Sequence, residues 1–221
     1  MIDVAHLYKT YSGGVNALKN VSLKVDKGEF VFLTGSSGAG KTTLFKMLSA
    51  FDRPSSGKIA VAGYDLMSIP NRDLPIFRRK IGVVFQDFRL LKDRDAFDNV
   101  ALPLLVRGES KLMIESKVRR VLDQVGLLEK SDVSPEIMSG GEQQRIAIAR
   151  AIVGQPVLLV ADEPTGNLDP TLSEDIMDLF ERVCSQGTTV VIATHDHEMV
   201  KRRNKRTLTL ENGVLRDEAS F

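Results

Sequence analysis

A stretch of eight small and polar residues has the composition and spacing of a phosphate-binding loop. Residues 35–42 read Gly-Ser-Ser-Gly-Ala-Gly-Lys-Thr, which fits G-x-x-x-x-G-K-[ST]. Such glycines let the backbone N–H groups converge on a phosphate, while the lysine reaches the β- and γ-phosphates and the threonine hydroxyl holds Mg²⁺. Residues 29–34 predict a strand before the loop, and residues 43–48 predict a helix after it, whose N-terminus favours an anion. The pattern predicts a nucleoside triphosphate site around Lys41 and Thr42.

Two carboxylates and a histidine follow apolar runs further along the chain. Residues 157–161 precede Asp162 and Glu163, and the run 188–193 leads through Thr194 to His195. Continuous apolar runs are typical of parallel strands buried on both faces, and ligand sites form at the carboxyl ends of such strands. We therefore expect Asp162 to hold Mg²⁺ through water and Glu163 to polarise an attacking water. His195 is placed to hydrogen-bond the γ-phosphate, although a lone histidine is usually structural.

A helix start with two glycines lies between these elements. Ser139 and Glu142 form the S-x-x-E pattern of a capping box, which alone would be structural. Gly140 and Gly141 between them leave backbone N–H groups open to an anion at a helix N-terminus. Because the chain already has a phosphate loop, this second contact could serve the triphosphate of a neighbouring molecule.

The remaining pattern indicates how these residues are positioned. The first thirty residues and residues 58–61 are typical of half-exposed antiparallel strands. Between about residues 87 and 138 the apolar residues repeat at helical spacing, with Gly126 as a weak point inside the pattern. This stretch predicts an inserted helical lobe. Residues 207–215 predict a hairpin with a type I′ turn at Asn212-Gly213.

Charge and hydropathy limit the classes of protein. The 30 basic residues oppose 29 acidic ones and give a net charge of +1, so we expect no nucleic-acid partner. The single cysteine, Cys184, excludes an internal disulfide and is expected to be a packing residue. No apolar run approaches the ~20 residues of a membrane span, and the start lacks a signal peptide. Association with a membrane must then come through a partner. The basic cluster 201–206 is expected to be a solvated helix end rather than a lipid-headgroup site.

Taken in order, these motifs resemble an ABC-type ATPase domain over essentially the whole chain. They are the phosphate loop, Gln86 after an apolar strand, the segment Ser-Gly-Gly-Glu-Gln at 139–143, the Asp-Glu strand end and His195. The resemblance implies a single α/β domain over residues 1–221. Residues 1–86 and 156–221 would form an N-terminal antiparallel β subdomain and a RecA-like, mostly parallel core sheet. Residues from about 87 to 155 would form an inserted α-helical subdomain that carries the signature motif.

The same resemblance implies roles for individual residues in a head-to-tail homodimer that sandwiches two ATP molecules. Tyr11 would stack on adenine, and Gln86 would sense Mg²⁺ and the partner. Residues 167–169 would lie across the dimer interface, while the signature segment would grip the γ-phosphate of the opposite protomer. Met138 stands where the family commonly has leucine, a change of little consequence. The implied catalytic residues are Lys41, Glu163 and His195, the metal-binding residues are Thr42, Gln86 and Asp162, and the ATP-binding residues are Tyr11, Gly35, Ser36, Ser37, Gly38, Ala39, Gly40, Lys41, Thr42, Thr43, Gln86, Ser139, Gly140, Gly141 and Glu142.

Within the family, residues 161–169 are similar to those of lipoprotein-release, macrolide-efflux and bacterial cell-division ATPases. Residues 71–75 and 81–91 favour the cell-division members, as does Ala39, where lipoprotein-release relatives more often carry serine. That subgroup implies an ATPase at the cytoplasmic face of the cell membrane, held there by an integral membrane partner, FtsX. Hydrolysis would drive regulation of septal cell-wall hydrolases, with division-ring proteins as further partners. The alternatives are an export or lipoprotein-release ATPase, and a nucleotide-gated division scaffold with negligible turnover.

Overall fold

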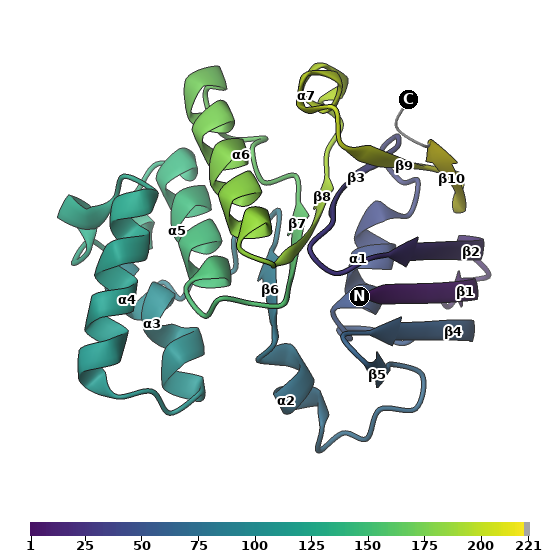
Figure 1. The fold of residues 1–221 in the computed structure, drawn as a ribbon, viewed down its shortest axis with the longest axis horizontal. Coiled ribbons are helices and arrows are strands. Elements are labelled where there is room, and N and C mark those ends of the chain that lie inside the picture. Colours follow the sequence, from purple (N-terminus) through teal and green to yellow (C-terminus); the bar gives the residue numbers. More distant parts are fainter. Residues whose placement is uncertain (219–221) are drawn as a thin grey trace.

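A mostly parallel sheet of six strands runs through the centre of the molecule (Figure 1). The computed structural model describes residues 1–218 of the 221. The strands of this sheet are β3 (Phe30–Thr34), β6 (Ile81–Val84), β7 (Leu158–Asp162), β8 (Thr189–Ala193), β9 (Arg206–Glu211) and β10 (Val214–Glu218). Their order is β10-β9-β3-β8-β7-β6; all neighbours are parallel except β10, which forms the predicted hairpin with β9. Asn212 and Gly213 in its turn both have positive φ, at 49° and 83°, as a type I′ turn requires.

A second, antiparallel sheet lies beside it and confirms the prediction for the first thirty residues. It consists of β1 (Ile2–Thr10), β2 (Asn16–Val25), β4 (Ser56–Val61) and β5 (Tyr64–Asp65), in the order β2-β1-β4-β5. Buried and exposed residues alternate along much of β1 and β2, which is the pattern of a sheet with one solvated face. The two sheets are joined where the N–H of Lys19 donates to the carbonyl of Gly213 at 2.7 Å.

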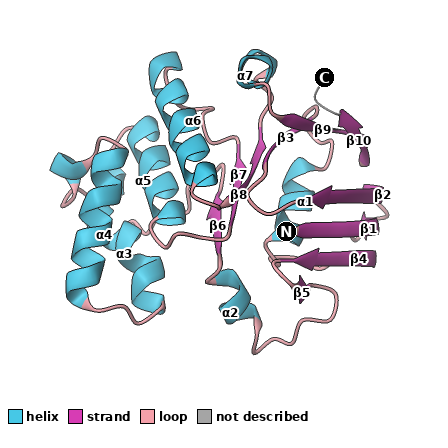
Figure 2. Cartoon of the chain, in the orientation of Figure 1, coloured by secondary structure: helices cyan, strands magenta, loops and turns pink. Residues whose placement is uncertain are grey.

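Helices cover the central sheet, and the helical lobe lies on the side away from the antiparallel sheet (Figure 2). The helices are α1 (Lys41–Leu48), α2 (Leu74–Arg78), α3 (Ala96–Val106), α4 (Lys111–Gln124), α5 (Gly140–Ile152), α6 (Pro170–Ser185) and α7 (His197–Arg203), with short 3-10 turns at Leu128–Lys130 and Pro135–Ile137. Helices α3, α4 and α5 form the helical lobe. Ser110, Ser139 and Asp169 begin α4, α5 and α6, and each side chain accepts from a backbone N–H in the first turn.

The structure corrects one expectation for the lobe. The apolar repeat continues past Gly126, but α4 ends at Gln124 and Gly126 has a φ of 65°. The N–H of Gly126 bonds to the carbonyl of Asp123, and that of Leu127 bonds to Leu122. Gly126 therefore terminates the helix, because glycine adopts the left-handed conformation of a helix end at little cost. The apolar residues after Gly126 enter the 3-10 turn Leu128–Lys130 and do not continue the α-helix.

The central strands are buried on both faces, as their continuous apolar runs predict. Along β3, Phe32 packs into a core shared with the helical lobe, while its neighbour Leu33 packs into a core shared with α1 and the antiparallel sheet. Leu159 and Val160 of β7 divide between the same two cores. Full burial of each such side chain stabilises the fold by roughly 1.5–3 kcal/mol. The parallel sheet therefore fixes the relative position of the lobe and the phosphate loop.

The basic cluster 201–206 lies at the end of α7, as expected, but it is only partly solvated, because Arg203 is held in ion pairs. Arg203 is only 13% exposed and its guanidinium pairs with carboxylates of α6, from Glu174, Asp178 and Glu181. Lys201 at the surface pairs with Glu198 at 3.4 Å. In residues 1–218 no helix combines the length and the apolar character needed to cross a membrane.

Candidate active site

The phosphate loop joins β3 to α1 and depends on glycine at two positions. Gly35 and Gly40 have φ values of 143° and 109°, which side chains rarely permit. A Cβ added to Gly35 would lie 2.2 Å from the carbonyl oxygen of Leu210, and one on Gly40 would lie 2.6 Å from that of Ala17. The loop is therefore pressed against β9 and β2 so closely that only glycine fits. This packing fixes the concave backbone that the sequence predicts.

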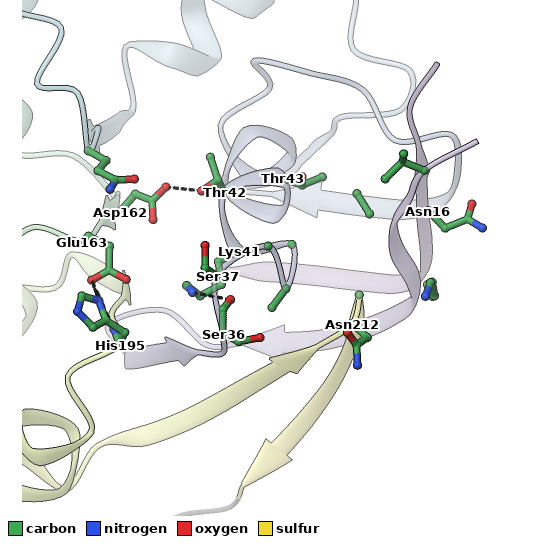
Figure 3. A pocket seen from close by; sticks show the side chains of 18 of the residues that line it. Asn16, Ser36, Ser37, Lys41, Thr42, Thr43, Asp162, Glu163, His195 and Asn212 are labelled. Atoms are coloured by element: carbon green, nitrogen blue, oxygen red, sulfur yellow. Dashed lines mark hydrogen bonds and ion pairs between the residues drawn. The ribbon is translucent and has the colours of Figure 1, made fainter. Parts of the chain in front are cut away.

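Lys41 lies folded over the loop that precedes it (Figure 3). Its ammonium donates to the carbonyl oxygens of Gly35 at 2.6 Å and Ser36 at 3.2 Å. These carbonyls hold a cation within the loop, at the place where a phosphate would be bound. The ammonium can exchange these neutral acceptors for charged phosphate oxygens, which form stronger hydrogen bonds.

Thr42 and Asp162 meet although they lie 120 residues apart. The Thr42 hydroxyl donates to Oδ2 of Asp162 at 2.8 Å (Figure 3). Asp162 ends β7, which lies between β8 and the edge strand β6, and is only 7% exposed. Burial raises the pKa of the Asp162 carboxyl; the bond from Thr42 opposes this rise, and the nearby charge of Glu163 adds to it. Hydroxyl and carboxylate oxygens so placed are the donor set that Mg²⁺ prefers.

Glu163 and His195 form a second contact at the same sheet edge. Oε2 of Glu163 lies 2.9 Å from Nδ1 of His195 and 3.4 Å from its backbone N–H. The Glu163 side chain is 14% exposed and that of His195 is 76% exposed. Glu163 has a φ of 50°, a strained conformation for a non-glycine residue, and its N–H is held by the carbonyl of Ala193. Because the backbone turns at Glu163, just after the end of β7, the two neighbouring carboxylates have different surroundings: Asp162 contacts Thr42 and Glu163 contacts His195.

A cavity of about 800 Å³ brings most of the predicted site residues together. Gln86 lines the cavity, together with residues of the phosphate loop and of the sheet edge. The phosphate loop and the start of α1 contribute Ser36, Ser37, Gly38, Ala39, Gly40, Lys41, Thr42 and Thr43, and the sheet edge contributes Asp162, Glu163 and His195. Tyr11 is not among the residues that line it. The Tyr11 hydroxyl donates to the Thr43 hydroxyl at 3.5 Å, and the ammonium of Lys9 lies 4.9 Å from the centre of its ring. The stacking of Tyr11 on adenine stays a prediction.

Sequence reasoning missed one wall of this cavity. The start of β2 contributes Asn16, Ala17 and Lys19, and the β9–β10 turn contributes Asn212 and Gly213. The turn was predicted as a hairpin, but its contact with the phosphate loop, where the N–H of Gly213 donates to the carbonyl of Ala39 at 3.0 Å, has no local signal. An Asn-Gly turn predicts where the chain reverses and not what the turn packs against.

The signature segment lies outside the cavity of its own chain. Ser139 caps α5, and the capping box with Glu142 is complete, which confirms that prediction. None of the residues 139–142 lines the cavity. A Cβ on Gly141 would lie 3.4 Å from the carbonyl oxygen of Asn167, so the helix start is packed beside the segment that leaves the Asp-Glu pair.

A phosphate loop between a strand and a helix, facing two carboxylates at the end of a parallel strand, defines a P-loop nucleoside triphosphatase. The profile of the ABC transporter family matches residues 18–166. The chain belongs to this family, and it is an ATP-binding ATP hydrolase.

Curated relatives and solved structures agree with this assignment. The Cell division ATP-binding protein FtsE of Escherichia coli K12 is 51% identical over 97% of both chains. The proteins of the same name from Bacillus subtilis and Mycobacterium tuberculosis are 47% and 48% identical, over 99% of this chain and 96% of theirs. A dimeric post-hydrolysis state of the ATP-binding cassette MJ0796, bound to ADP and Pi, has a TM-score of 0.93 at 36% identity and covers 99% of this chain and 98% of that one.

Proposed function

We propose that this chain is the ATPase subunit of a bacterial cell-division complex of the FtsE–FtsX kind. The observation that carries the proposal is an identity near one half, over nearly the full length, to proteins named FtsE in distant bacteria. In this proposal ATP hydrolysis at the cytoplasmic face of the membrane moves an FtsX-like integral membrane partner, which regulates septal cell-wall hydrolases. Division-ring proteins are further partners, and nucleic acid is not one.

The geometry supports hydrolysis with named roles. The phosphate loop cradles the triphosphate, and Lys41 stabilises charge on its β- and γ-phosphates. Glu163 orients and polarises the attacking water, while the backbone N–H of His195 donates to the Glu163 carboxylate and the His195 ring contacts the γ-phosphate. Thr42 and Asp162, with Gln86, would hold Mg²⁺, which supplies positive charge to the phosphates when it is bound.

The position of the signature segment supports a dimer. Because residues 139–142 lie outside the cavity of their own chain, they are free to contact a triphosphate bound to a second copy. A head-to-tail homodimer would then sandwich two ATP molecules, each between the phosphate loop of one chain and the start of α5 of the other. The similar cassette MJ0796 is dimeric. We expect a monomer or weak dimer without ATP, because each interface needs binding energy from the nucleotide.

An apolar groove supports a membrane partner. The groove, of about 390 Å³, lies between β6 and α3, and its lining includes Phe51 and Val106, which are 45% and 52% exposed. A neighbouring cavity of about 470 Å³ shares Val83 with this groove and shares Gln86 with the nucleotide cavity. A segment of the partner seated in the groove would therefore lie next to the cavity that Gln86 lines. Exposed apolar patches of this kind are typical of interaction sites.

Purification of the Glu163→Gln variant from its host membranes, with ATP and Mg²⁺, tests this function. Mass spectrometry of the co-purifying proteins should identify an FtsX-like membrane protein with septal or hydrolase proteins. A lipoprotein-release or efflux permease in its place would contradict the division role and leave the catalytic assignments intact. A steady-state ATPase assay with the partner present separates the enzyme from a scaffold, since a scaffold would show negligible turnover.

A further inference from the structure

A carboxylate lies at the helix start that the proposed function assigns to the γ-phosphate of a second copy. Glu142 occupies the first turn of α5, three residues after the cap Ser139. The partial positive charge of a helix N-terminus favours an anion, but an ionised side chain in the same turn repels one. A phosphate-binding helix start with glutamate therefore needs a compensating charge. The inference rests on the proposed function of this segment.

The carboxylate of Glu142 is held by three donors. Its Oε2 accepts from the backbone N–H of Ser139 at 2.9 Å and from the Ser139 hydroxyl at 3.0 Å. Its Oε1 accepts from the ammonium of Lys130. These bonds lower the pKa of the Glu142 carboxyl to about 2, and the bond from Lys130 has the largest effect. The carboxyl is therefore ionised at neutral pH. The Ser139 hydroxyl donates to the carboxylate while the Lys130 ion pair is in place, so a phosphate must displace the carboxylate to accept from this hydroxyl.

Lys130 is presented to Glu142 by a turn of fixed backbone. It ends the 3-10 turn Leu128–Lys130, where its N–H bonds to the carbonyl of Leu127 and its carbonyl accepts from Val133. Its side chain is 51% exposed, while that of Glu142 is 15% exposed. Among the ion pairs of residues 1–218, Lys130 takes part only in the one with Glu142. The ammonium thus reaches the first turn of α5 from a separate element of the lobe.

We propose that Lys130 is a positioning residue for ATP-dependent dimerisation, because its ammonium neutralises the Glu142 carboxylate in the first turn of α5. With its charge shared by the ammonium, the carboxylate competes less strongly for the Ser139 hydroxyl. That hydroxyl can then turn to the γ-phosphate of the second copy. Without Lys130, an uncompensated carboxylate in a partly desolvated site faces a phosphate of like charge, and the two repel.

The test compares variants in the hydrolysis-blocked Glu163→Gln background, in which sedimentation velocity measures the ATP-induced dimer dissociation constant. Lys130→Met should weaken the dimer about tenfold, equivalent to about 1.4 kcal/mol. The double variant Lys130→Met, Glu142→Gln should have a dimer dissociation constant within about twofold of that of Glu142→Gln alone. The reason is that glutamine still completes a capping box but carries no charge for Lys130 to neutralise. The deficit of Lys130→Met should narrow as salt screens the repulsion.

Two controls separate charge from folding. Lys117→Met breaks a comparable ion pair of the same lobe, with Glu109, and should leave the dimer constant unchanged. Binding of a fluorescent ATP analogue to the monomer should also be unchanged in Lys130→Met, since Lys130 does not line the nucleotide cavity. Lys130→Gln provides a second neutral variant and should behave as Lys130→Met does, at an unchanged melting temperature.

The possible results lead to different conclusions. If the Glu163→Gln parent does not dimerise with ATP, the proposed sandwich is wrong and the role of Lys130 is wrong with it. If the parent dimerises and Lys130→Met dimerises equally well, only the role of Lys130 is overturned. A deficit of the same size in the Glu142→Gln background would also overturn it, because Lys130 would then act by packing and not by charge.

Discussion

Replacement of Glu163 by glutamine tests the assignment of the group that polarises the attacking water. The amide has the shape of the carboxylate, so it can still accept from the backbone N–H of His195, which lies 3.4 Å from Oε2. Residue 163 also keeps its left-handed φ at a similar cost, since glutamine and glutamate have the same backbone preferences. We therefore expect the free energy of unfolding to change by less than ~1 kcal/mol.

Hydrolysis should respond much more strongly than folding. Loss of a positioned general base lowers turnover by roughly 10²–10⁴-fold, which corresponds to about 2.7–5.5 kcal/mol of transition-state stabilisation. Steady-state phosphate release measures this effect, and titration with ATP should show retained binding and a trapped dimer.

Glu198→Gln is the matched control for this variant. Glu198 lies three residues after His195, is 74% exposed and pairs only with Lys201 among the described residues. Its replacement should leave turnover unchanged. Turnover at the wild-type rate in Glu163→Gln would refute the assignment, and an equal loss in both variants would show that the effect is a general change of surface charge.

Three further variants probe other parts of the structure. Lys41→Ala removes the ammonium that lies over the phosphate loop and should weaken ATP binding at least ~100-fold, or about 2.7 kcal/mol, in a fluorescent-nucleotide titration; normal affinity would contradict the loop's function. Gly82→Ala places a Cβ 2.4 Å from the carbonyl oxygen of Ala151 and should lower the free energy of unfolding in urea by about 1–3 kcal/mol, whereas an unchanged midpoint would mean that β6 and α5 can separate. Arg203→Met should lower the free energy of unfolding by about 1–2 kcal/mol in the same assay, after allowance for the exposure of its acidic partners. Lys201→Met, at an exposed position, should lower it by less than ~0.5 kcal/mol. Equal effects would mean that the ion pairs of Arg203 with α6 do not stabilise the fold.

The parts of the fold that depend on local pattern could be predicted from the sequence. The strand and helix around the phosphate loop, the hairpin at Asn212 and the buried strands β7 and β8 are all present. Each is specified within about ten residues, by glycine placement, a turn dipeptide or a continuous apolar run. The position of Asp162 and Glu163 at one strand end follows from the same local pattern.

The contacts that complete the site could not be predicted in this way. Thr42 and Asp162 meet because β3 and β7 lie on either side of β8, an order that the periodicity of each strand does not encode. The wall formed by Asn16 and Gly213 depends on β2 lying beside the β9–β10 turn. The apolar spacing marked Gly126 only as a weak point, although α4 ends at Gln124, because the apolar spacing continues beyond the end of the helical backbone.

The strand order also sets a sequence of events during synthesis of the chain. The antiparallel strands β1, β2 and β4 are complete by residue 61, and they can pair early. Strand β3 lies between β8 and β9, which leave the ribosome roughly 160 residues later, or about 10–30 s at ~5–20 residues per second. During this interval an apolar strand with two unpaired edges is exposed to chaperones and to other nascent chains. The nucleotide cavity, lined by residues up to Gly213, therefore cannot be complete until the β9–β10 turn has been synthesised.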